Sequence, residues 1–103
     1  MIKPDNATEV FQFLGELLDK SRQAGDAPTS AKLEYARHFL TPAVTSEFME
    51  EAIVALLAIA ATRPPEFSSQ DLKTISQLAS AIERRWFGPN LGRSGSESKQ
   101  VKK

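Results

Sequence analysis

The stretch that decides the fold is EEAIVALLAIAATRPPEF, residues 50–67. The ten residues from Ala52 to Ala61 are all small or apolar; two glutamates precede them, and Arg63 and two prolines follow. At about 1.5 Å per residue they cover roughly 15 Å, against about 30 Å for the hydrocarbon core of a bilayer. Because charged residues flank the stretch on both sides, we predict a helix of a folded core and no membrane span.

The faces of this helix leave two readings open. Successive residues lie about 100° apart, which gathers the large side chains on one broad face, namely Met49, Ile53, Leu56, Leu57 and Ala60. The side where a surface helix would carry charge has Ala55, Ala58 and Thr62 instead. A helix with so little polar face is usually buried. It is therefore either surrounded by its own chain or also part of an interface with another chain.

Along the whole chain, the apolar periodicity and the capping residues predict a small all-α bundle of about four helices. Their approximate ranges are 6–24, 30–40, 46–62 and 68–87. Asn6 with Glu9 fits a capping box, and so does Ser68 with Asp71. Gly25 is a natural stop for the first helix, and residues 26–30 read as a loop before the second.

Charge divides the chain into an acidic body and a basic end. Residues 84–103 hold six of the 13 basic residues and one of the 13 acids, a balance of +5, so the remaining residues carry −5. After Asn90 the sequence is mostly Gly, Ser and charge, which cannot bury enough apolar surface to offset its ordering entropy. We predict one helical domain over residues 1–90 and a disordered, flexible basic tail over 91–103.

Signals for catalysis are poor, and we predict no enzyme, no cofactor and no metal site. The chain has no cysteine and a single histidine, His38, whose only nearby helical partner is Glu34. Three glutamates near residue 50 could be taken for acid–base groups, but the start of a helix favours negative charge without any catalytic role. The absence of cysteine and of a long apolar block near Met1 predicts a cytoplasmic location.

Wide apolar arcs favour a role in protein–protein contacts. We predict a small soluble helical protein with an adaptor, accessory, chaperone-like or inhibitor role, acting as a homodimer or on another protein. The residues predicted to meet the partner are Phe11, Leu18, Ala55, Ala58 and Phe87.

The alternative is a nucleic-acid-associated regulatory protein that uses its basic end. Its candidate phosphate contacts are Arg84, Arg85, Arg93, Lys99, Lys102 and Lys103. Trp86 and Phe87 adjoin the first two arginines and could stack on a base. A simpler reading of the same residues is that the arginines complement the helix C-terminus and that Trp86 continues the core stripe.

Overall fold

The computed structural model describes residues 2–40 and 45–88, which contain four helices and no strand. These are α1 (Ala7–Gln23), α2 (Ala27–Arg37), α3 (Thr45–Thr62) and α4 (Ser69–Trp86). The all-α bundle predicted from the sequence is therefore confirmed. The tail predicted for residues 91–103 lies outside the described residues.

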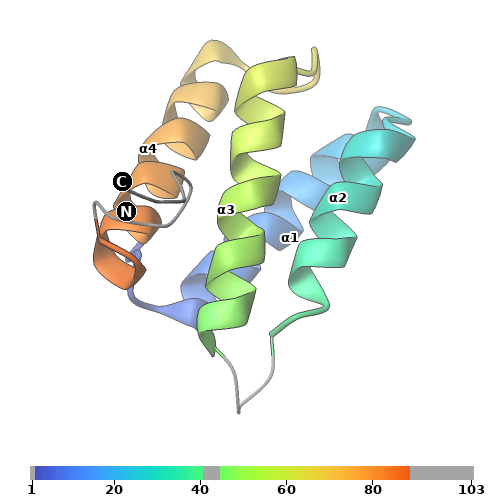
Figure 1. Cartoon of the computed structure of the whole chain (residues 1–103). Helices are drawn as coiled ribbons and strands as arrows, with labels where there is room; N and C mark the ends of the chain where they lie inside the picture. The colour runs from blue at the N-terminus through green and yellow to red at the C-terminus, as the bar shows by residue number, and fades with distance from the viewer. Residues whose placement is uncertain (1, 41–44, 89–103) are drawn as a thin grey trace, which may run out of the picture.

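Helix α3 holds the bundle together. It lies between α4 on one side and the pair α1 and α2 on the other (Figure 1), and it packs against all three. Helices α1 and α2 also pack against each other, whereas α4 packs closely on α3 alone. The apolar residues 52–61 therefore lie in the central helix, and without α3 the helix α4 would lose its main packing partner.

The junction between α1 and α2 differs from the prediction. Gly25 adopts a φ of 74°, and the N–H groups of Gly25 and Asp26 bond to the carbonyls of Arg22 and Ser21, which closes the end of α1 as a Schellman motif. Asp26 then caps α2, since its carboxylate accepts the N–H of Thr29 at 3.2 Å.

Helix α2 consequently begins at Ala27, three residues before the predicted start. The loop predicted for residues 26–30 is wrong because Pro28 falls in the first turn of α2, where a missing N–H costs nothing. The helix also ends at Arg37, and residues 38 and 39 form a turn.

Helices α3 and α4 follow the predicted boundaries closely. Thr45 and Ser46 lie inside the first turn of α3. The helix ends where Arg63 turns to a φ of 51° before Pro64. Ser68 and Asp71 form the predicted capping box, and Phe67 and Leu72, spaced as a hydrophobic staple, are both buried.

Residues 2–6 connect α1 with the far end of α4. The indole Nε1 of Trp86 donates to the carbonyl of Pro4 at 2.9 Å, across 82 positions of sequence. Asn6 caps α1 by accepting the N–H of Glu9 at 3.1 Å, and the Glu9 carboxylate accepts from Lys3 N–H. Hydrogen bonds therefore hold this segment to both α1 and α4, and it connects the two terminal helices.

Candidate interaction surfaces

The outer face of α3 is the apolar surface that the fold leaves uncovered. Five exposed residues follow one another at intervals of three and four, so they form one stripe along the helix: Glu47, Glu50, Val54, Leu57 and Ala61. Val54 is 57% exposed and Leu57 is 40% exposed. Val54 and Leu57, three residues apart, are therefore neighbouring large aliphatic side chains at the centre of the stripe.

The structure settles which sides of α3 are buried. Leu57, which the pattern places on the broad apolar face, is exposed, whereas Ala55, on the alanine side that the sequence left open between burial and an interface, is only 4% exposed. The physical reason is that α3 is flanked on two sides and from behind, so its buried arc is wider than a single face (Figure 1). Between Ala52 and Ala61 every side of the helix is apolar, so the pattern there could not indicate which narrow arc would remain outside.

The other predicted partner residues are largely occupied by the chain itself. Leu18 is 3% exposed and belongs to the core. Phe11 and Phe87 are partly buried against the core, and Ala58 is partly exposed on the flank of the α3 stripe. Their role in partner binding stays a prediction, and Leu18 and Ala55 could be reached only if helices separated.

Phe11 is covered by a cation that the sequence analysis did not single out. The guanidinium Cζ of Arg37, from α2, lies 3.9 Å from the centre of the Phe11 ring. The ring of Phe48, from α3, lies beside the same ring, with centroids 6.2 Å apart. A Cβ at Gly15 would lie 3.1 Å from Nη2 of Arg37. A glycine in the middle of a helix was the sequence signal for this close approach.

Tyr35 on α2 is the third large hydrophobic residue that is exposed within the described ranges, at 61%. Its ring packs edge-on against Phe39, with centroids 5.0 Å apart. The hydroxyl of tyrosine tolerates water, so this exposure needs less explanation than that of Val54 and Leu57.

At the basic end, the structure places two of the six predicted cations. Arg84 and Arg85 are exposed at the end of α4, and Arg85 lies 4.0 Å from the carboxylate of Asp5. Trp86 donates its indole N–H to Pro4 and packs against the core, as the simpler reading of the sequence expected. Arg93, Lys99, Lys102 and Lys103 lie outside the described residues.

Beside α4 runs an open groove of about 640 Å³. Its residues come from the outer side of α4 and from the segment before α1: Ile2, Pro4, Gln70, Thr74, Gln77, Leu78, Ala81 and Arg84. Most of its polar side chains are exposed, and Arg84 is the one charged residue among the described residues that line it. Such a lining gives little basis for selecting a ligand.

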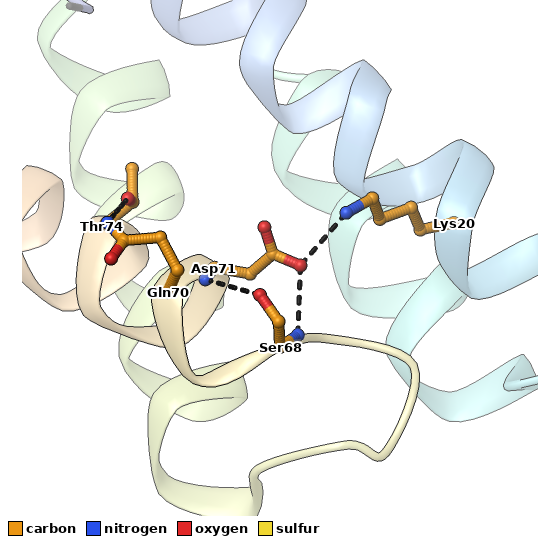
Figure 2. A network of polar contacts seen from close by, with 5 residues as sticks. All are labelled: Lys20, Ser68, Gln70, Asp71 and Thr74. Atoms are coloured by element: carbon orange, nitrogen blue, oxygen red, sulfur yellow. Dashed lines mark hydrogen bonds and ion pairs between the residues drawn. The ribbon is translucent and has the colours of Figure 1, made fainter.

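A polar cluster at the start of α4 fixes the helix and ties it to α1. The Asp71 carboxylate accepts from the N–H of Ser68 at 3.0 Å and from Nζ of Lys20 at 2.9 Å (Figure 2). The hydrogen bond from the Ser68 N–H, followed by that from Lys20, lowers the pKa of Asp71. These contacts fix the first turn of α4 and join it to α1.

Asp26 and Glu66 form an acidic pair between two connections of the chain, the one before α2 and the one between α3 and α4. Hydrogen bonds from Thr29 lower the pKa of the Asp26 carboxyl, the cap of α2. Burial raises the pKa of Glu66, which faces Asp26 from the α3–α4 connection. One Glu66 oxygen is buried without a hydrogen-bond partner. No third acidic or histidine ligand joins this pair in the part of the chain that the structure describes.

Among the described residues, no group of three or more His, Asp or Glu side chains is placed to hold a metal ion. No helix there has the length and apolarity needed to cross a membrane. No protein-family model matches the chain, and comparison with curated proteins and with solved structures finds no match.

Proposed function

We propose that this protein acts through protein–protein contacts and that the outer face of α3 is the contact surface. The observation that carries the proposal is the exposure of Val54 and Leu57 at the centre of that face. Fully burying one such side chain contributes about 1.5 to 3 kcal/mol. An adaptor, accessory, chaperone-like or inhibitor role is compatible with a rigid helix that presents such a stripe.

The surroundings of the stripe support this assignment. Helix α3 is held from both sides and from behind, so its outer face is presented without any need for rearrangement. A preorganised surface binds at a lower entropic cost than one that must be ordered first. Glutamates on the same stripe add charge next to the apolar centre, as the polar rim of an interface does.

The absence of cysteine makes a direct test possible. A single Val54→Cys substitution can carry a benzophenone photo-crosslinker, and Gln77→Cys carries the same label on the exposed side of α4. We expect a specific cross-linked product from position 54, in the purified protein or in an extract of its native cells, and none from position 77. No product at position 54, or equal products at both positions, would count against the proposal.

A nucleic-acid-associated role is the second candidate, favoured by the exposure of the neighbouring Arg84 and Arg85. It predicts retardation of DNA or RNA that weakens as salt is added. The binding should be lost when both arginines become glutamine and residues 91–103 are deleted. Binding that survives these changes, or that is absent even at low salt, would exclude this role.

A further inference from the structure

Two carboxyls meet at the end of the bundle where two helix connections lie. The connection between α1 and α2 and the connection between α3 and α4 are at the same end of the molecule (Figure 1). Asp26 ends the first connection, and Glu66 belongs to the second. The two carboxyl groups are within hydrogen-bonding reach of each other. This pair is therefore a contact between the two helical hairpins, α1 with α2 and α3 with α4.

The contact has no proton donor when both carboxyls are ionised. A carboxylate oxygen only accepts hydrogen bonds, so two carboxylates cannot bond to each other. One Glu66 oxygen is buried without a hydrogen-bond partner, and a buried polar atom in this state costs free energy. A proton on Glu66 removes the charge from this buried position. It also makes the carboxyl a donor that the Asp26 carboxylate can accept.

We propose that Asp26 and Glu66 bind one proton between them in mild acid, and that this proton joins the two helical hairpins. Asp26 is the acceptor, because its carboxylate already accepts the N–H of Thr29 at 3.2 Å, a bond that favours the anion. Glu66 is the donor, because its side chain holds the buried oxygen. At neutral pH both carboxyls are charged, and repulsion replaces the hydrogen bond. This pH-dependent contact does not involve the outer face of α3.

The two pKa values define the pH range of this contact. Burial, followed by the hydrogen bond with Asp26, raises the pKa of Glu66 above its ordinary value of 4.5. Hydrogen bonds from Thr29, followed by that with Glu66, lower the pKa of Asp26 below 3.8. The stability due to Glu66 is therefore complete below pH 4.5 and is lost as the pH rises through the folded value. The stability due to Asp26 is lost only as the pH falls through its own folded value, which lies below 3.8.

The neighbouring charges do not neutralise an ionised Glu66. Lys32 on α2 acts on Asp26 and lowers its pKa further, which favours Asp26 as the acceptor. The charge that acts on Glu66 is that of Asp26 itself. Other charged side chains of these helix ends are paired or exposed: Arg22 with Glu34, Lys20 with Asp71, and Arg63.

The substitution Glu66→Gln tests the proposal, because an amide donates to Asp26 at every pH and carries no charge. At pH 7 this variant should unfold at a higher urea concentration than the wild type. The difference should shrink as the pH falls to 4.5, where the wild type binds the proton. Glu16→Gln, on an exposed site of α1, is the matched control and should differ from the wild type equally at both pH values. A difference for Glu66→Gln that does not change with pH would overturn the proposal.

The titration of Glu66 is a second readout, and it uses the wild-type protein. In the folded state its carboxyl carbon should titrate above pH 4.5 by NMR. Asp26→Asn retains a good cap for α2 but removes the neighbouring charge, so Glu66 should titrate at a lower pH in this variant. A wild-type value at or below 4.5, or one that Asp26→Asn does not lower, would show that the pair shares no proton.

Hydrogen exchange measures whether the proton joins the two hairpins. The N–H of Asp26 bonds to the carbonyl of Ser21 at 2.8 Å, and the N–H of Phe67 bonds to that of Pro64 at 3.2 Å. After correction for the intrinsic rates, both amides should be better protected at pH 4.5 than at pH 7 in the wild type, and equally protected in Glu66→Gln. The same gain of protection in both proteins would assign it to other groups and contradict the proposal.

Discussion

Helices α3 and α4 are matched in length and packed on each other, yet their outer faces differ. Each has 18 residues, and each buries a row of large apolar side chains against its neighbours. The exposed side of α4 is polar throughout: Ser69, Gln70, Lys73, Ser76, Gln77, Ser80, Arg84 and Arg85. The exposed side of α3 carries Val54 and Leu57 at its centre.

This difference between the exposed sides of α3 and α4 shows that the outer face of α3 needs an explanation and that of α4 does not. A helix that meets only water gains nothing from aliphatic side chains outside, and α4 shows that this chain can build a fully polar outer face. The partner contact proposed above would account for the aliphatic side chains on the outer face of α3.

The inner faces should behave alike. Leu56 on α3 and Ile75 on α4 are both fully buried, so Leu56→Ala and Ile75→Ala should each lower the free energy of unfolding by about 2 to 5 kcal/mol. Urea unfolding measures both. If one of them cost less than about 1 kcal/mol, the two helices would not be equal members of the core.

The outer faces should behave differently. The midpoint of thermal unfolding should rise with the concentration of the wild-type protein, because association stabilises the folded state. Val54→Lys should remove this dependence, whereas Gln77→Lys on α4 should keep it. At low concentration all three proteins should agree within about 0.5 kcal/mol, as exposed substitutions usually do. A concentration-independent wild type would exclude self-association through the outer face of α3.

The helix starts should also differ. Ser68→Ala removes the cap of α4 and should cost about 1 kcal/mol in the free energy of unfolding. Ser46→Ala, in the first turn of α3, should cost far less, since Ser46 lies within the helix and alanine is the better helix former. Equal losses in chemical denaturation would show that α3 depends on Ser46 for capping.

The start of α4 should respond to pH through Asp71. Its pKa is lowered in the folded protein, from an ordinary value of 3.8, by the hydrogen bonds from Ser68 and Lys20. The stability that this carboxylate contributes is therefore complete above about pH 4 to 5 and is lost as the pH falls through the folded value. Urea unfolding between pH 6 and pH 3 should show a smaller loss of stability for Asp71→Asn than for the wild type. An equal loss would mean that the Asp71 contacts add no stability.

The smallest effect is expected at Phe11, an apolar ring that the chain covers for itself. Gly15→Ala should gain about 1 kcal/mol of helix stability but displace the Arg37 guanidinium, whose contact with the ring is worth about 0.5 to 1 kcal/mol. We expect a net change near zero. In an Arg37→Ala background, the same substitution should stabilise by about 1 kcal/mol. Equal effects in both backgrounds would show that Arg37 does not constrain position 15.

Local chemistry made much of this fold readable from the sequence. The caps Asn6 and Ser68, the stop at Gly25 and the Arg63-Pro64 break each act within a few residues, so four helices could be placed without knowing how they pack. The early start of α2 was not predicted because Asp26 acts at two helix ends. Its backbone N–H closes the end of α1, and its carboxylate caps α2.

The surface of α3 was decided by tertiary structure alone. Its sequence determined that it would be helical and centrally placed, because ten consecutive small or apolar residues cannot be solvated cheaply. It could not determine which arc would stay outside, since Leu57 and Ala55 are both compatible with burial. That arc was set by the directions from which α1, α2 and α4 approach, and those directions depend on contacts between residues far apart in the chain.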